Sequence, residues 1–493
     1  MAAQGGARRP SRPGRRDLPF VPRVVNPVRV EEVILLAAAE EVRAARRAIE
    51  SALPWTKVRV CSNPLALQAA CADRPTVVVV DDTALNLADI AAARRCCSRL
   101  VVVLLSAHRL VQASPPAFAR EACPYVAQAD LVFAVDATRW APERTVLAAI
   151  RAAEDHLNIE QRPDVHRFIF LVVDDEPRWF SEFLPVLYEI IGQRAGVRLA
   201  RTFEEASRFL FGTADESEMG LLPAVQGHGD DVIGLITDMY FPRGGVVTGD
   251  AGRALVELVA CRYPRIPIIV ASKTREADEL CADALVLPKG DPGFLPALRA
   301  YIRDRTGMGD FVIADRDGQE WYRLKDVRDM RQMLVEASSP EPTAEELRRI
   351  LSAYGEQDRF SSWFHMHGFR RLADRLRPER LTGEPMVALL RRELTRELAR
   401  VRRTPLVLDG HRVTDLPTLL AVLRSAPPER IQAAADHDTL SGWLDLQGCS
   451  ELADDLRPVH GRGVEFREAV AAVVAKWMDI YSRRAGRKKG KSL

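Results

Sequence analysis

The fold of this chain is decided by the stretch 168–177, Phe-Ile-Phe-Leu-Val-Val-Asp-Asp-Glu-Pro. Six consecutive apolar residues are typical of a short strand that is buried on both faces of a parallel sheet. An acidic pair, Asp174 and Asp175, follows at the point where that strand ends. The stretch 232–238, Val-Ile-Gly-Leu-Ile-Thr-Asp, repeats the pattern and ends at Asp238. Two such strands in one region predict an α/β domain whose helices cross over between parallel strands.

Three further strands are expected in this region. Short apolar or β-branched runs recur there at intervals that leave room for crossover helices, and the turn-like residues 161–163 precede the first of them. We expect the five strands of this unit at 167–173, 197–200, 232–237, 266–271 and 284–287.

Polar residues stand where these strands end. Asp174 and Asp175 follow the first strand, Asp238 the third, Ser272 the fourth and Lys289 the fifth. Ligands of doubly wound sheets bind outside the carboxyl ends of the strands, so we expect these five side chains to converge. Neighbouring carboxylates repel one another, and a hard divalent cation such as Mg²⁺ relieves that repulsion. One carboxylate can then attack phosphorus, while a hydroxyl and an ammonium group neutralise charge on the transferred oxygens.

In this order, the motifs resemble the receiver domain of two-component response regulators. The resemblance covers about residues 165–305 and lies in the ordered combination of motifs, since an isolated acidic pair would not be specific. It implies that Asp238 accepts a phosphoryl group from a sensor histidine kinase or a phosphotransfer protein. The residues that carry it are 172–177, 236–242 with Gly245, 268–272 and the pair Pro288-Lys289.

The resemblance also implies a role for each residue of the pocket. Ser272 would be the switch hydroxyl, and Lys289 would be the ammonium group that binds the phosphoryl oxygens. The ligands of Mg²⁺ would be Asp174, Asp175, Asp238 and the backbone carbonyl of Tyr240.

The chain departs from the family pattern in the last part of this region. Gly290 stands where a proline usually follows the lysine, and Val286 stands where the family usually has an aromatic switch residue. The stretch between Ser272 and Lys289 is short, which predicts an abbreviated fourth helix. The resemblance therefore supports phosphorylation better than it supports the usual coupling of hydroxyl and aromatic residue. An acidic insertion at about 215–231 is interpreted as a surface excursion rather than a lid.

A second α/β pattern precedes this domain. Asp81 and Ser106 follow its third and fourth strands, but no acidic pair follows the first strand and no lysine follows the fifth. We interpret the unit as a degenerate receiver that serves packing, dimerisation or partner binding; phosphorylation of Asp81 is the alternative. Its strands are expected at 32–36, 58–60, 76–81, 100–105 and 131–136, with helices at 40–52 and 142–156.

From about Gly309 the chain becomes rich in Leu, Arg and Glu, and it contains an internal repeat. The segment 361–378, with Ser-Ser-Trp-Phe, Leu-Ala-Asp and Leu-Arg-Pro, returns at 441–458 as Ser-Gly-Trp-Leu, Leu-Ala-Asp and Leu-Arg-Pro. Trp363 and Trp443 fit an apolar stripe at helical spacing, so we expect them in the core. The repeat resembles a bacterial module, without an assigned activity, that occurs beside receiver domains and in proteins similar to phosphoenolpyruvate synthases.

The expected fold class is α/β, with two flavodoxin-like, doubly wound, five-stranded parallel-sheet domains in tandem, followed by an all-α repeat region. No catalytic pattern follows Gly309, so we expect no enzyme beyond the receiver's own phosphotransfer and dephosphorylation. The expected divisions are a disordered basic leader at 1–27, a degenerate receiver-like domain at 28–158, a phosphoacceptor receiver domain at 164–306, helical repeat 1 at 309–400, helical repeat 2 at 405–483 and a basic disordered tail at 484–493.

Composition narrows the setting of the protein. The chain has 493 residues, 47% of them hydrophobic and 28% charged, with a net charge of +2. That balance argues against a general nucleic-acid-binding surface, which usually carries a basic excess. The eight cysteines show no metal-ligand or pairing pattern, and the apolar runs are too short to span a bilayer. We therefore expect a cytoplasmic protein without membrane contact.

The sequence thus predicts a response regulator that signals to an unidentified protein partner through its helical repeats, with a homodimer as an open alternative. Two rival interpretations remain. One is a constitutive scaffold whose receiver pocket is vestigial. The other is a nucleic-acid-binding regulator that uses the basic ends of the chain, near 8–16 and 483–491.

Overall fold

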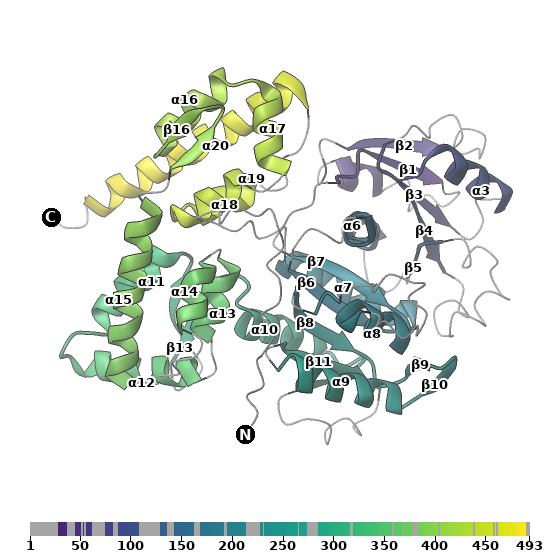
Figure 1. The fold of residues 1–493 in the computed structure, drawn as a ribbon, viewed down its shortest axis with the longest axis horizontal. Helices are drawn as coiled ribbons and strands as arrows, with labels where there is room; N and C mark the ends of the chain where they lie inside the picture. The colour runs from purple at the N-terminus through teal and green to yellow at the C-terminus, as the bar shows by residue number, and fades with distance from the viewer. Residues whose placement is uncertain are drawn as a thin grey trace, which may run out of the picture.

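The computed structural model folds the chain into two five-stranded parallel sheets with helices on their faces, followed by a mainly helical region (Figure 1). The predicted basic leader at 1–27 lies outside the residues that the structure describes, as do most of the acidic insertion and the stretch 274–283, where the abbreviated helix is predicted. The described residues are 28–36, 45–50, 53, 56–61, 74–81, 87–107, 129–135, 142–161, 168–191, 195–212, 227–229, 231–264, 266–273, 284–315, 319–356, 359–367, 369–376, 383–402, 405–436, 439–456, 459 and 462–489.

The first sheet has the strand order β2-β1-β3-β4-β5, and every pairing in it is parallel. Runs of Val, Ile and Leu form four of these strands, and nearly all of their residues are buried, as expected for a sheet covered on both faces; the edge strand β2 is partly exposed. The predicted strands are confirmed to within two residues at either end. The elements of this unit are β1 (Glu32–Leu36), β2 (Lys57–Cys61), β3 (Thr76–Asp81), α3 (Leu87–Cys96), β4 (Leu100–Ser106), β5 (Leu131–Ala134) and α6 (Pro142–Gln161).

The second sheet has the strand order β12-β11-β8-β6-β7, again with parallel pairing throughout. In both sheets the second strand of the unit lies at one edge and is followed by the first, third, fourth and fifth strands. The prediction of two five-stranded parallel sheets is confirmed. The elements of this unit are β6 (Ile169–Val173), α7 (Pro177–Ile191), β7 (Gly196–Ala200), α8 (Phe203–Phe211), β8 (Val232–Thr237), α9 (Asp250–Arg262), β11 (Ile268–Ser272), β12 (Leu285–Pro288) and α10 (Phe294–Thr306).

A small hairpin, absent from the sequence prediction, follows Asp238. Its strands β9 (Phe241–Arg243) and β10 (Val246–Thr248) pair antiparallel around Gly244 and Gly245. Both glycines have positive φ angles, 61° and 80°, which a two-residue hairpin turn of the favoured hand requires. The hairpin gives a structural reason for glycine at these two positions.

The two α/β units share one apolar core. Helices α6 and α7 lie between the sheets, where their apolar faces pack with inward-facing residues of both, and α10 packs against α7 and the second sheet. Val79 and Phe133 contribute from the first sheet, Phe170 and Val172 from the second, and Leu187 from α7. The outer face of the first sheet packs on α3, and that of the second packs on α8 and α9. The two units are therefore joined by burial of apolar surface rather than by a linker alone.

Asp155 is the polar centre of this shared core. The carboxylate, on α6, accepts hydrogen bonds from the Tyr188 hydroxyl at 2.9 Å and from the Val197 backbone N–H at 2.8 Å. Burial is the main reason that the pKa of Asp155 is raised to about 6. Gly196 leaves room for this side chain, because a Cβ there would lie 3.1 Å from its Oδ1.

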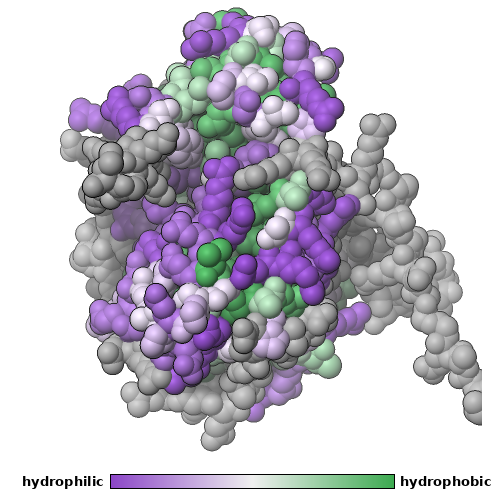
Figure 2. Space-filling model, turned by 90° about the vertical axis from the view of Figure 1, so that its left-hand side faces the viewer, coloured by the Kyte–Doolittle hydropathy of each residue, from purple (hydrophilic) through white to green (hydrophobic). Residues whose placement is uncertain are grey.

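The C-terminal region consists of two halves with the same order of described elements, a hairpin followed by five helices. Trp363 and Trp443 are buried, as predicted, in one core that runs through both halves. Figure 2 views the molecule from this side and shows apolar side chains in patches between hydrophilic ones. The elements are β13 (Phe311–Ala314), β14 (Glu320–Leu324), α11 (Val327–Glu336), α12 (Pro342–Glu356), α13 (Arg359–Met366), α14 (Arg370–Leu376), α15 (Gly383–Arg402), β15 (Leu406–Leu408), β16 (His411–Val413), α16 (Leu416–Ser425), α17 (Pro428–Asp436), α18 (Thr439–Leu446), α19 (Ser450–Leu456) and α20 (Gly463–Lys489).

Two predictions for this region are wrong. The region is not all-α, because β13 pairs with β14 and β15 pairs with β16. The turn of the second hairpin is Asp409-Gly410, whose φ angles of 49° and 76° fit a two-residue hairpin turn. The predicted disordered tail at 484–493 is also incorrect in its start, since α20 continues to Lys489.

Contacts tie the C-terminal region to both α/β units. Helix α10 packs against α13, and Arg359 pairs with Asp304 at 3.3 Å. Farther along the chain, Arg462 forms an ion pair with Glu31 of the first unit.

We predict that Asp155→Asn reduces the pH dependence of stability. The folded-state pKa of about 6 exceeds the ordinary value of 3.8, so the contribution of Asp155 is full below about pH 3.8 and is lost as the pH rises through about 6. Between about pH 5 and about pH 7.5 the wild type should lose about 1 kcal/mol more unfolding free energy than the variant. Urea denaturation at the two pH values measures this difference, and parallel curves for the two proteins would contradict it.

Candidate metal centre

The carboxyl edge of the second sheet brings together acidic and basic residues from four strands. Asp174 follows β6 and its N–H donates to the Ala200 carbonyl at 3.0 Å, while the Asp238 N–H donates to the Val173 carbonyl at 2.8 Å. These bonds extend the backbone pairing of the sheet by one residue at each strand end. These backbone hydrogen bonds therefore fix the Cα positions from which the Asp174 and Asp238 side chains extend. Parallel pairing places the two residues at the ends of neighbouring strands.

Three carboxylates and one ammonium group form the acidic pocket. One oxygen each of Asp174, Asp175 and Asp238 lies within 4.8 Å of the others, and all three residues are buried. The Lys289 Nζ lies 2.7 Å from Asp174 Oδ2 and 2.5 Å from Asp238 Oδ2, and its side chain is 1% exposed. When all three carboxylates are ionised, three negative charges and one positive charge leave two net negative charges in a buried site.

The pKa values of the pocket residues are shifted by burial and by the charges of their neighbours. Burial raises the pKa of Asp174 to about 6 even though Lys289 opposes the shift. Burial also raises the pKa of Asp175 to about 7, and the charges of Asp174 and Glu176 add to the increase. Burial alone would lower the pKa of Lys289, but Asp174 and Asp238 outweigh it and raise that pKa. Lys289 is therefore charged in the pocket, in which the carboxylates disfavour full ionisation.

The residues present fit a divalent cation. Within the described part of the chain Lys289 is the only cation paired with this cluster, and Asp175 has no ion pair. An ion with two positive charges matches the charge that remains, and carboxylate oxygens are the ligands that Mg²⁺ prefers. When bound, Mg²⁺ would neutralise charge on the oxygens of an incoming anionic group.

Local backbone contacts orient the Asp238 side chain. The Met239 N–H donates to Asp238 Oδ1 at 2.6 Å. The Gly252 N–H, in the first turn of α9, donates to the Met239 carbonyl at 3.1 Å. A Cβ at position 252 would lie 2.5 Å from the Asp238 carbonyl oxygen, so only glycine permits α9 to approach this closely. Tyr240 follows directly, and the role of its carbonyl as a ligand stays a prediction.

Ser272 and Lys289 lie side by side at the ends of β11 and β12. The Lys289 N–H donates to the Ser272 carbonyl at 2.8 Å, and Ser272 is fully buried. The structure thus brings the backbone of Ser272 to the same edge as the acidic pocket. Its role as a switch hydroxyl stays a prediction.

Sequence reasoning missed the residues that form the rim of the pocket, Glu176, Trp179 and Lys273. Glu176 Oε1 lies 2.7 Å from Lys273 Nζ, and the Trp179 indole N–H donates to Glu176 Oε2 at 2.8 Å. The Trp179 ring faces two ammonium groups, with its centroid 5.4 Å from Lys289 Nζ and 5.6 Å from Lys273 Nζ. The available signal was position, since Glu176 follows Asp175 and Lys273 follows Ser272 directly.

The first sheet has no comparable site among its described residues. Asp81 ends β3, and β5 ends at Ala134 without a lysine beside it. In the described ranges, the acidic pocket of the second sheet is the one group of His, Cys, Asp or Glu side chains close enough to share a metal ion. The role assigned to the first unit from its sequence remains a prediction.

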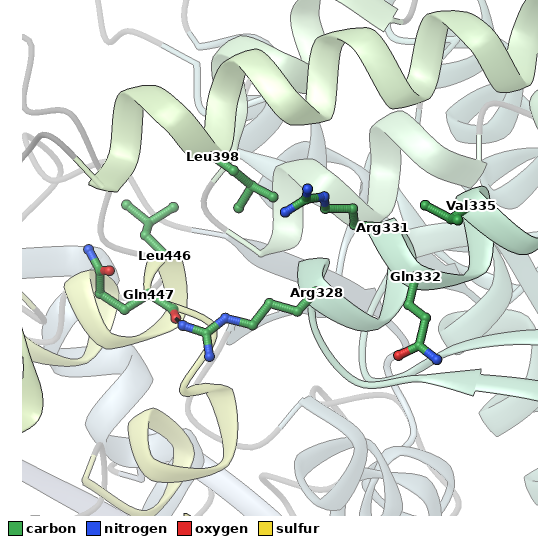
Figure 3. A pocket seen from close by; sticks show the side chains of 7 residues that line it. All are labelled: Arg328, Arg331, Gln332, Val335, Leu398, Leu446 and Gln447. Atoms are coloured by element: carbon green, nitrogen blue, oxygen red, sulfur yellow. Dashed lines mark hydrogen bonds between the residues drawn. The ribbon is translucent and has the colours of Figure 1, made fainter. Parts of the chain in front are cut away.

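A second hollow lies between the two halves of the C-terminal region. Its volume is about 350 Å³. Figure 3 shows Arg328 extending towards Gln447 and Arg331 lying near Leu398, so both guanidinium groups border the hollow. No acidic residue is among its described lining residues, which are Arg328, Arg331, Gln332, Val335, Leu398, Leu446 and Gln447.

Comparisons with known proteins give a weak structural likeness and no family. No family model and no curated protein matches the chain. A solved protein provisionally described as a two-component system response regulator/GGDEF domain protein matches with a TM-score of 0.28 and 17% identity, over 55% of this chain and 98% of that chain. A provisionally described sugar-binding protein from Salmonella typhimurium LT2 matches with a TM-score of 0.17 and 14% identity, over 55% and 85% of the two chains. TM-scores this low carry no argument about function.

None of the described helices combines the length and the apolar character that crossing a bilayer requires.

We predict that Asp175→Asn stabilises the metal-free protein and removes its response to Mg²⁺. The contribution of Asp174 and Asp175 to stability is full below about pH 3.8 and is lost as the pH rises through about 6 and about 7, so crowding costs most at pH 8. At about pH 8, Mg²⁺ at about ten times its dissociation constant should add about 1.4 kcal/mol to the wild type and nothing to the variant.

Thermal unfolding with EDTA and with Mg²⁺ measures both effects. Asp81→Asn is the matched control, because it removes a strand-end aspartate from the first sheet and should keep the wild-type response. An Asp175→Asn protein that still gains stability from Mg²⁺ would contradict this assignment of the ligand.

Proposed function

We propose that this chain is a cytoplasmic response regulator of a two-component phosphorelay, in which Asp238 accepts a phosphoryl group with Mg²⁺ present. The observation that supports this most is the convergence of three buried carboxylates and one buried ammonium group at one sheet edge. Both sheets also have the strand order of the flavodoxin-like class, whose ligands bind at this edge. The motifs that resemble the receiver family supply the residues of the pocket.

In the proposed reaction Asp238 acts as the nucleophile. One carboxylate oxygen forms a bond to the phosphorus of the donor as the bond from phosphorus to the donor breaks, and the leaving group keeps that electron pair. The donor is a phosphohistidine of a sensor kinase or phosphotransfer protein, or a small acyl phosphate. The Lys289 ammonium, already in contact with Asp238, neutralises charge on the transferred oxygens, and Ser272 offers its hydroxyl to them.

Asp174 and Asp175 would hold Mg²⁺ together with Asp238 and the Tyr240 carbonyl. Their raised pKa values favour a proton on one carboxyl group when no cation is bound. Cation binding would therefore release protons and should strengthen as the pH rises.

We place the output in the C-terminal region, whose halves we infer to be two copies of one unit. The hollow between them joins apolar residues to two arginines and lacks acidic lining residues. The partner segment that binds there should therefore carry acidic as well as apolar side chains. A scaffold whose receiver pocket is vestigial would share this surface, so phosphorylation is the observation that separates the two functions.

We predict that the wild type incorporates acid-labile phosphate from acetyl phosphate and Mg²⁺, whereas Asp238→Asn does not. Loss of the nucleophile should lower incorporation to background. Lys289→Ala should lower the rate by at least tenfold, because removing one preorganised charge commonly costs two to four kcal/mol of transition-state stabilisation. Phosphate-affinity gel electrophoresis with acid lability as a check measures both.

Asp81→Asn serves as the control for this experiment. It removes the aspartate at the matching strand end of the first sheet and should label like the wild type. Label that persists in Asp238→Asn but disappears in Asp81→Asn would move the phosphoacceptor to the first unit. No label in any of the proteins would favour the scaffold.

A further inference from the structure

We propose that the phosphorylation state of Asp238 is read inside this chain by the N-terminal α/β unit, through the first turn of α7. The inference rests on the proposed function, since it assigns a recipient to the same pocket. Three consecutive residues, Trp179, Phe180 and Ser181, carry the connection. The first touches the rim of the pocket, and the other two touch the edge strand of the other sheet.

Trp179 is the end of this connection that faces the pocket. Its ring lies against the ammonium groups of Lys289 and Lys273, and its indole N–H is held by Glu176. Lys289 also contacts Asp238, so the same ammonium group is shared by the phosphoacceptor and the tryptophan. A phosphoryl group on Asp238 adds negative charge that competes for both lysines. Because an ammonium group is attracted to an aromatic face, Trp179 should move when the lysines move.

Phe180 and Ser181 are the end that faces the first unit. The Phe180 ring packs edge-on against Phe133 of β5, with centroids 5.8 Å apart and an interplanar angle of 89°. The Ser181 Oγ accepts a hydrogen bond from the Ala134 N–H at 3.0 Å. All four residues are buried, so this is an internal contact.

The position of β5 explains why this contact transmits a change. Among the strands that the structure describes, β5 is at the edge of its sheet and pairs only with β4. Its free side meets α7, where Ser181 satisfies the Ala134 N–H. Trp179, Phe180 and Ser181 are consecutive residues of one helix, so a shift of the backbone at Trp179 displaces Phe180 and Ser181 with it. The expected result is a weaker bond between Ser181 and Ala134 in the phosphorylated state.

The test measures amide hydrogen exchange of residues 131–135 in the full chain, with Mg²⁺ alone and with Mg²⁺ plus beryllium fluoride as the phosphoryl mimic. The wild type should exchange at least threefold faster with the mimic. Trp179→Leu, which removes the aromatic face, and Ser181→Ala, which removes the acceptor, should show no change on adding it. Ser181→Ala leaves every contact of the pocket intact, so its acid-labile labelling from acetyl phosphate should equal that of the wild type. Trp321→Ala replaces a partly buried tryptophan in β14 and should respond like the wild type.

The labelling assay keeps the two hypotheses apart. Normal labelling of the wild type with unchanged exchange at 131–135 would overturn the connection and leave the proposed function standing. An exchange response that persists in both Trp179→Leu and Ser181→Ala would overturn this route. A wild type that neither labels nor responds to beryllium fluoride would remove the proposed function, and the connection with it.

Discussion

Everything at the candidate site depends on the burial of three carboxylates against a single ammonium group. Removing one carboxylate from water is costly, and placing three together multiplies that cost. The Lys289 ammonium group and the backbone N–H groups bonded to Asp174 and Asp238 offset part of this desolvation cost. The remaining part appears as raised pKa values at Asp174 and Asp175. Such a cluster lowers the stability of the fold. Perturbed pKa values of this kind are common at functional sites.

The sheet supplies the rigidity that this arrangement needs. Asp174 and Asp238 continue the hydrogen-bonded ladder of their strands, and the Lys289 N–H bonds to the Ser272 carbonyl. Each side chain therefore starts from a backbone position fixed by its neighbours. Gly252 lets α9 pack closely against the backbone of Asp238 and Met239. Geometry of this kind comes from packing outside the pocket as much as from the charged groups.

The sequence allowed much of this structure to be predicted, for identifiable physical reasons. Strands β8 and β3 begin and end within one residue of their apolar runs, because a strand buried on both faces must be apolar along most of its length. Polar residues at the ends of such strands were a sound guide to Asp174, Asp238 and Lys289, since parallel pairing leaves them at one edge. The convergence of these side chains agrees with the sequence-based expectation; their chemical roles remain proposals.

Other features were missed because their signals are short or non-local. Asp409-Gly410 between apolar residues is a strong hairpin signal, but it is only two residues long and lies between long helical patterns, which predict an all-α region. The rim formed by Glu176 and Lys273 joins residues far apart in the chain, and neither has a motif of its own. Periodicity shows that α6 and α7 have apolar faces, but it does not show which surface covers them.

That last point has a consequence for how the protein is organised. Because one core includes side chains of both sheets, neither α/β unit has a complete interior without the other. The two units are separate along the sequence, but their side chains pack in one core. Separating them would expose Phe133, Phe180 and Leu187 to water. The two α/β units should therefore unfold in a single cooperative transition. Recombination that separated them would leave each unit with an incomplete core and should be selected against.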